Sequence, residues 1–350
     1  VSPKPFLWLE MKKTLFSIAA VLLGFLAHSQ EAESLDRFAE VSVITRLDAN
    51  PAYNSADSEF GFDLGNTSIY TLFEGSLSEH FSWTVANHWF HAESDGEYGW
   101  PYKYLGHSDS TNWLDYFKLD LGLGNWGLTL GKDMIATGGF EYEDWDWDIY
   151  PVFSSPLANS MSCYQWGGTL SYTTLSGMSN FSAQMTTSPF GEHPFSSGLW
   201  AYSAKWRGEY GAFSNIWSAS ALETAKGEYM YIFWLGQQVC LDSWIATLDL
   251  SNAYGSDEDF TSSALHGGTA ALTVKYAPSD RFNASLRGSC VLSGDKETVP
   301  DHWTVGGIAE FYPLKESDDL RLHALLSYNS LLSQVTFSVG ARYNLRLKVF

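Results

Sequence analysis

The sequence is poor in charged residues, in cysteine and in long apolar runs. Only 17% of its 350 residues are charged, whereas soluble domains usually have about a quarter. No run approaches the roughly 18 consecutive apolar residues that a typical membrane-spanning helix needs. The three cysteines, Cys163, Cys240 and Cys290, are odd in number and widely spaced, so they predict neither a disulfide framework nor a metal site.

Basic residues are scarce as well. The chain has 20 Lys and Arg against 40 Asp and Glu, which gives a net charge of -20 at pH 7. So acidic a chain is not expected to bind nucleic acid or anionic membrane surfaces, because like charges repel. We find no pattern that predicts catalytic residues, a metal site or a cofactor.

The N-terminal region has the pattern of a secretory signal. Basic residues at Lys12 and Lys13 precede an apolar run from Leu15 to Leu26, and Ala27-His28-Ser29 supplies small residues for cleavage. An N-terminal membrane anchor is the alternative, but the apolar run is short for one. We therefore predict an upstream extension over 1–10, a signal peptide over 11–29 and one domain over 30–350.

From residue 30 onward, apolar and polar side chains alternate in segments of about ten residues separated by turn residues. This repeated pattern is typical of transmembrane β-barrel strands, and the 16% aromatic content suits a membrane interface. We predict sixteen strands, over 38–47, 62–77, 80–91, 113–122, 126–134, 164–174, 180–188, 199–208, 212–222, 229–239, 243–253, 267–277, 282–293, 303–312, 320–328 and 334–347.

The connections between these segments alternate in length. The short ones are 78–79, 124–125, 209–211, 241–242 and 278–280, and the long ones are 48–60, 92–112, 135–163, 189–198, 254–266 and 294–302. Outer-membrane barrels have short periplasmic turns and longer external loops. The chain is therefore predicted to be an all-β, antiparallel transmembrane barrel of the bacterial outer membrane, with both termini in the periplasm.

The period of two assigns the faces of the strands. In segment 199–208, Trp200, Tyr202 and Trp206 share one face, and Lys205 and Arg207 share the other. Since an unpaired charge in hydrocarbon costs several kcal/mol, the basic face must be the lumen. The predicted lumen bases are Lys118, Lys132, Lys205, Arg207, Lys275, Arg287, Arg321 and Arg342. They would either form one wall opposite an acidic loop or pair individually with nearby carboxylates.

The long connection 135–163 is the third external loop of such a barrel. Its acids are Glu141, Glu143, Asp144, Asp146 and Asp148. Because sixteen strands enclose an aqueous channel, a loop folded inward would narrow the pore and place carboxylates there. The alternative is a loop on the outer rim. The spacing of the three aspartates also resembles the start of a calcium loop, although the remaining ligands are missing.

Two groups of residues are shared with a known family. One runs from Gly131-Lys132-Asp133 to Gly138-Gly139-Phe140-Glu141-Tyr142-Glu143, and the other comprises Glu310-Phe311-Tyr312-Pro313-Leu314 and Asp319-Leu320-Arg321-Leu322-His323-Ala324. Through these residues the chain resembles the phosphate-selective porin O/P family, in the branch found in Bacteroidetes-type Gram-negative bacteria. The resemblance covers most of 30–350.

This resemblance implies a sixteen-stranded outer-membrane porin, usually a homotrimer, with inward-folded loops. The family draws anions through an arginine ladder and a lysine cluster. The loop 135–163 has five acids and no base before Cys163, which departs from that pattern. We therefore carry over the pore function and Lys132 as a lumen charge, but not phosphate selectivity.

The prediction is a passive channel for small ions or hydrophilic solutes, surrounded by outer-membrane lipid. Three alternatives come from other classes of protein. A closed structural or adhesive barrel would share every feature except an open lumen. An outer-membrane lipase needs a Ser–His pair, for which only the neighbours His107-Ser108 stand out. A secreted carbohydrate-binding β-protein would explain the Trp and Tyr content but not the alternating connections.

Overall fold

The computed structural model describes residues 39–64, 67–92, 98–99, 114–144, 155, 164–191, 195–255, 267–292, 300–315 and 317–349. The predicted extension 1–10 and signal peptide 11–29 lie outside these ranges. Among the described residues, no helix is long and apolar enough to cross a membrane.

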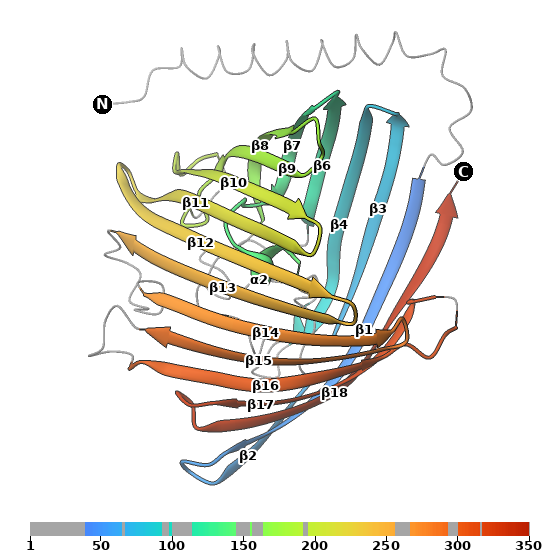
Figure 1. Ribbon diagram of the computed structural model, residues 1–350, viewed down its shortest axis with the longest axis vertical. Coiled ribbons are helices and arrows are strands. Elements are labelled where there is room, and N and C mark those ends of the chain that lie inside the picture. Colours follow the sequence, from blue (N-terminus) through green and yellow to red (C-terminus); the bar gives the residue numbers. More distant parts are fainter. Residues whose placement is uncertain are drawn as a thin grey trace.

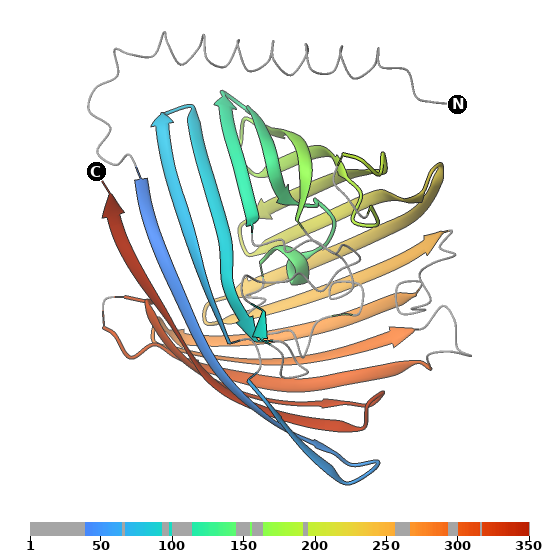
Figure 2. The same cartoon turned by 180° about the vertical axis from the view of Figure 1, so that it is seen from behind.

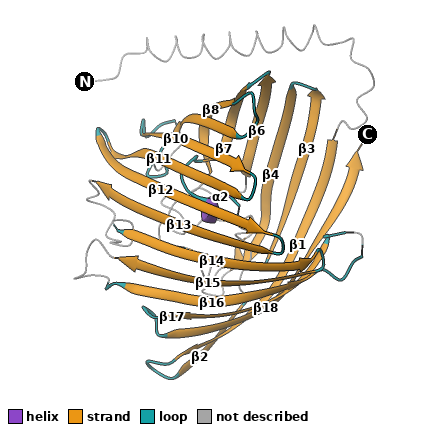
Figure 3. Ribbon diagram, in the orientation of Figure 1, coloured by secondary structure: helices purple, strands orange, loops and turns teal. Residues whose placement is uncertain are grey.

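Sixteen long strands form the wall of the molecule (Figure 1, Figure 3). The first eight are β1 (Ala39–Asn54), β3 (Ser68–Ser78), β4 (Phe81–Ala92), β6 (Leu114–Leu123), β7 (Trp126–Met134), β8 (Tyr164–Thr173), β9 (Ser179–Thr187) and β10 (Trp200–Tyr210). The other eight are β11 (Phe213–Ala225), β12 (Glu228–Leu241), β13 (Trp244–Gly255), β14 (Gly268–Ser279), β15 (Phe282–Leu292), β16 (His302–Phe311), β17 (Leu320–Asn329) and β18 (Gln334–Val349). All sixteen predicted strands are confirmed.

The sheet closes on itself, because β1 pairs with β18 as well as with β3. Every pairing is antiparallel, and each long strand follows its neighbour in sequence order. Two short strands, β2 (Glu59–Asp63) and β5 (Tyr98–Gly99), pair with the ends of β1 and β4, respectively. The predicted all-β antiparallel barrel is therefore the observed fold.

Two details of the connections differ from the prediction. Segment 48–60 is not a loop, because β1 continues to Asn54 and a tight turn leads into β2. The alternation of lengths is also not strict. Lys226 and Gly227, the latter with φ +83°, make a tight turn at the end of the barrel where the predicted connections are long, and 312–319 is a longer connection at the opposite end.

Side chains alternate between the outside and the lumen as predicted. On β15, Leu286 is 70% exposed whereas the next residue, Arg287, is 4% exposed. Aromatic rings gather near the ends of the strands on the outer face. Trp206 contacts Trp217 with ring centroids 5.1 Å apart, and Trp244 contacts Tyr276 at 4.5 Å. Such rings are typical of the interfacial girdles of membrane barrels.

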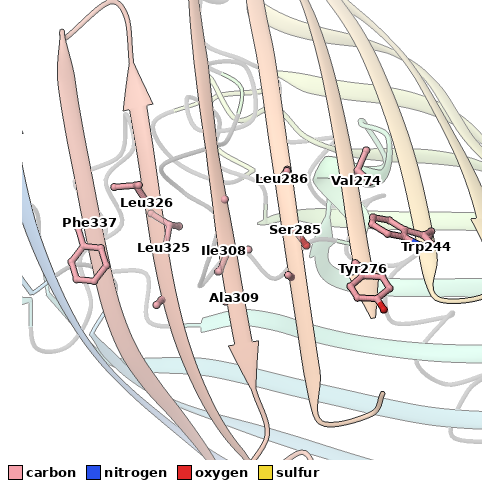
Figure 4. Close-up of a pocket in the computed structure, with 13 residues that line it drawn as sticks. Trp244, Val274, Tyr276, Ser285, Leu286, Ile308, Ala309, Leu325, Leu326 and Phe337 are labelled. Atoms are coloured by element: carbon pink, nitrogen blue, oxygen red, sulfur yellow. The ribbon is translucent and has the colours of Figure 1, made fainter. Parts of the chain in front are cut away.

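The outer wall also carries a shallow apolar groove of about 470 Å³ over β14 to β18 (Figure 4). Its lining includes the small residues Ala309 and Ala324, with Leu286, Leu326 and Phe337 around them. Because this groove lies on the face that carries the apolar side chains, it is separate from the lumen.

Candidate functional site

Residues 135–144, which begin the connection 135–163 after β7, turn into the barrel (Figure 1, Figure 2). This described part includes a short helix, α2 (Phe140–Glu143), which lies inside the ring of strands. Side chains on the inner wall accept hydrogen bonds from backbone N–H groups of the loop. The N–H of Ala136 donates to Gln184 Oε1 at 2.6 Å, and the N–H of Gly138 donates to Ser218 Oγ at 2.7 Å. The loop is thus seated on the wall, since buried backbone groups need such partners.

Asp249 on β13 anchors the start of α2. Its two carboxylate oxygens accept the N–H groups of Phe140 and Glu141, each at 3.0 Å. Oδ1 also accepts the indole N–H of Trp234 at 3.2 Å. Asp249 is not among the predicted site residues, and its only signal in the sequence is that of an acid at a lumen-facing position of a strand.

Three glycines let the loop lie close to the wall. A Cβ on Gly236 of β12 would come within 3.0 Å of Phe140, and one on Gly139 would lie 2.6 Å from the Trp234 ring. Gly138 has φ +127°, a conformation that other residues rarely adopt. A larger side chain at Gly139 or Gly236 would push the loop away from the wall, and one at Gly138 would collide with Tyr142 of the same loop.

An apolar cluster fills the space between the loop and β10 to β13. Ile135 and Tyr142 of the loop pack with Leu222, Ile232 and Trp234 of the wall. The Tyr142 and Trp234 ring centroids are 6.4 Å apart. In β12, apolar residues occupy both faces of the strand instead of one, which is a sign of this cluster that can be read from the sequence.

Three loop acids each meet one of the predicted lumen bases. The pairs are Glu141 with Arg287 at 3.0 Å, Glu143 with Lys205 at 2.7 Å and Asp144 with Arg207 at 2.9 Å. The geometry therefore matches individual pairing for these six residues. Asp146 and Asp148 lie outside the described residues.

The pairs differ in burial. The side chains of Glu141 and Arg287 are 1% and 3% exposed, whereas those of Asp144 and Arg207 are 34% and 37% exposed. Glu141 also accepts the backbone N–H of Ser155, which ties the returning arm of the loop to α2. Because water can solvate the partners of the exposed pair but not those of the buried one, losing one partner should cost more in the Glu141 pair.

A cavity of about 360 Å³ lies beside α2 in the lumen. Phe140 and Asp144 line it from the loop, and Lys275, Arg321 and Arg342 line it from the wall. In register, Arg342 stands opposite Arg321 and also opposite Arg46 on β1. The cavity thus has a basic wall facing a loop edge that carries one acid. Within the described part of the chain, no carboxylate pairs with Lys275.

Glu310 and Tyr312 complete the wall of this cavity. Arg321 Nη1 lies 3.6 Å from Glu310 Oε1, and the Tyr312 hydroxyl donates to the same oxygen at 3.1 Å. Burial raises the pKa of the Tyr312 hydroxyl, and the Glu310 carboxylate raises that pKa further. Tyr312 is therefore a neutral donor at physiological pH.

Lys118 and Lys132 lie apart from these contacts. Lys118 Nζ is 3.9 Å from Asp133 Oδ1 and also lies over the ring of Tyr116. Lys132 is 2% exposed and donates to the carbonyl of Leu114.

The described residues contain no group of three or more His, Cys, Asp or Glu side chains able to hold a metal ion. The calcium alternative depends on Asp146 and Asp148, and the lipase alternative on His107 and Ser108. All four residues lie outside the described ranges.

No protein-family model matches the sequence, and no curated protein matches it either. Solved structures do match the fold. The outer-membrane channel DcaP of Acinetobacter baumannii has a TM-score of 0.59 at 12% identity, covering 90% of this chain and 99% of that one. A mutant porin of Rh. blastica has a TM-score of 0.59 at 11% identity, covering 88% of this chain and 100% of that one.

The outer membrane protein OmpT of Vibrio cholerae, in its trimer form, gives a TM-score of 0.53 at 11% identity. That match covers 88% of this chain and 100% of the other. At such identities the likeness establishes the fold, which is that of the outer-membrane β-barrels.

Proposed function

We propose that this outer-membrane β-barrel is a passive diffusion channel for small ions and hydrophilic solutes, narrowed by its third loop. One observation carries the proposal: the loop is seated on the inner wall by Asp249 and three ion pairs, next to a lumen cavity of about 360 Å³. A sixteen-stranded barrel is too wide for wall side chains alone to fill. An inward loop then determines what can pass.

The charges around the cavity support a transverse field. Three bases, Lys275, Arg321 and Arg342, and one acid, Glu310, lie on the wall side, and Asp144 lies on the loop side. Rings of carboxylates favour cations, and rings of Lys and Arg favour anions. Since Glu141, Glu143 and Asp144 are each paired with a base, we propose modest ion selectivity. Phosphate selectivity is not part of the proposal.

Liposome swelling tests the channel function. Proteoliposomes containing the refolded protein are placed in isotonic solutions of neutral sugars of increasing size. We expect the smallest sugars to enter and the larger ones to be excluded, because the loop limits the passage. If a fully folded barrel admits none of them, the closed structural or adhesive barrel is the better function.

We propose a homotrimer as the assembly. The resemblance to the phosphate-selective porin O/P family implies one, and a similar solved structure is described in a trimer form. Analytical ultracentrifugation in a density-matched detergent tests the proposal. A mass of one chain at all concentrations would contradict it.

A further inference from the structure

Besides the buried Glu141–Arg287 pair and the hydrogen bonds that the Ala136 and Gly138 N–H groups donate to the wall, two kinds of contact hold the start of the third loop. Glu143 with Lys205 and Asp144 with Arg207 join the ends of flexible side chains. Lysine and arginine have several rotatable bonds, so such a pair can persist while the loop's main chain shifts. These two pairs therefore do not fix the path of the backbone.

Asp249 holds the main chain itself. Its two oxygens accept successive backbone N–H groups, from Phe140 and Glu141, and its side chain is short. The residue lies within β13, which is paired with β12 on one side and β14 on the other. Hydrogen bonds to a carboxylate are stronger than those between neutral groups. A rigid part of the wall thus determines where the loop backbone lies.

The wall is shaped to receive the backbone at this point. Gly236 stands opposite Asp249 in register, and a Cβ there would lie 2.8 Å from Asp249 Oδ1 and 3.0 Å from the Phe140 nitrogen. A Cβ on Gly139 would lie 2.2 Å from Asp249 Oδ1. The two glycines and the aspartate therefore form one seat for the loop.

Resting on the channel function proposed above, we propose that Asp249 is the positioning residue that holds residues 135–144 of the third loop inside the lumen and so sets the width of the passage. Without its carboxylate, the N–H groups of Phe140 and Glu141 lose their acceptors in a buried site. Such unpaired donors are costly, so the loop leaves its seat to reach water. The passage beside it then widens.

Single-channel conductance of Asp249→Val in a planar bilayer tests this directly. We expect a rise of roughly twofold over the wild type, because a wider passage carries more ions. Asp249→Asn keeps one acceptor oxygen and should give a smaller rise. Ser251→Ala is the matched control, since Ser251 is a buried residue on the same strand and the same face. Its conductance should equal that of the wild type.

Thiol labelling measures the loop without relying on conductance. Thr137 in the loop is 0% exposed, and threonine is close in size to cysteine. Thr137→Cys is made with Cys163, Cys240 and Cys290 replaced by serine. In this background, a water-soluble maleimide should label the thiol of Thr137→Cys slowly. Adding Asp249→Val should make labelling roughly tenfold faster, because local opening of the loop exposes the thiol. Gly236→Ala serves in place of Asp249→Val if that variant does not refold.

The outcomes separate the two proposals. Faster labelling with a silent wild-type barrel would support the positioning role and contradict the channel function. Equal labelling and equal conductance in a folded Asp249→Val barrel would overturn the positioning role and leave the channel intact. Faster labelling together with higher conductance would support both.

Discussion

Glu141 and Asp144 belong to the same loop but make ion pairs of very different kinds. Glu141 and Arg287 are almost completely buried, whereas about a third of Asp144 and Arg207 faces water. Removing one partner of a buried pair leaves an uncompensated charge in a poorly solvated site. Removing one partner of an exposed pair leaves a charge that water can solvate. Burial therefore decides which of these residues is important for stability.

We predict that Glu141→Gln lowers the free energy of unfolding by about 3–5 kcal/mol, because Arg287 would remain buried without its carboxylate. Asp144→Asn is the matched control and should change it by about 0–1 kcal/mol. Reversible urea unfolding in lipid vesicles, followed by tryptophan fluorescence, measures both. Equal losses for the two variants would contradict this account.

A second residue-scale prediction concerns Lys275, which lines the lumen cavity. Lys275→Gln removes a positive charge from the wall of the cavity, so the permeability ratio should shift toward cations by roughly twofold. The reversal potential across a KCl gradient measures this shift. Lys226→Gln, in the turn between β11 and β12, is the control and should leave the ratio unchanged. An unchanged ratio in both variants would place the ion path elsewhere.

At the scale of elements, the seam that closes the barrel has its own polar bridge. Asp48 on β1 reaches across β18 to β17, where His323 Nε2 lies 2.9 Å from Asp48 Oδ1. The same carboxylate forms an ion pair with Arg46, whose Nε lies 2.6 Å from Asp48 Oδ2. Gly340 lies between them in register, opposite Asp48 on one side and His323 on the other. The bridge can form because Gly340 has no side chain to fill the space between Asp48 and His323.

We predict that Gly340→Ala destabilises the barrel by about 1–3 kcal/mol, because overpacking a buried site forces neighbours apart. An added Cβ would lie 1.9 Å from Asp48 Oδ1 and 2.6 Å from His323 Nε2. Gly288→Ala on β15 is the control, since nothing lies within 4 Å of its Cβ position. The urea midpoint in vesicles measures both variants, and a Gly340→Ala midpoint no lower than that of Gly288→Ala would contradict the prediction.

The strands could be predicted from sequence because each carries its signal locally. A period of two over about ten residues needs no knowledge of the partner strand. The extension of β1 beyond residue 47 was missed, because residues 51–54 owe their strand conformation to pairing with β2 and β18. The tight turn at Lys226 and Gly227 breaks the predicted alternation of connection lengths, because the length of a connection depends on the strands that it joins and not on a local motif.

The seat of the loop could be predicted only in part. The acids and bases of the lumen were identified, but which acid meets which base depends on strand register across the barrel. Asp249 and Phe140 are 109 residues apart in sequence, and no periodic pattern relates them. The roles of Gly139 and Gly236 could not be predicted either, because they arise only when the loop lies on the wall.

In the molecule as a whole, the barrel forms the wall and the described part of the third loop lies inside it. The closed sheet satisfies all its strand edges, which a structure in hydrocarbon requires. Its outer face is apolar, and its lumen carries the charges. The loop, seated by Asp249, occupies part of the lumen beside a cavity with a basic wall. We therefore propose a water-filled path through the barrel, which the third loop narrows from inside.

Single-channel recording of the refolded protein in a planar bilayer with a KCl gradient tests this claim most directly. The account predicts stable, uniform conductance steps with a reversal potential that reflects modest selectivity. Folding is verified beforehand by heat-modifiable electrophoretic mobility and a β-rich circular dichroism spectrum. A folded barrel that inserts into the bilayer and gives no steps would contradict the account and favour a closed barrel.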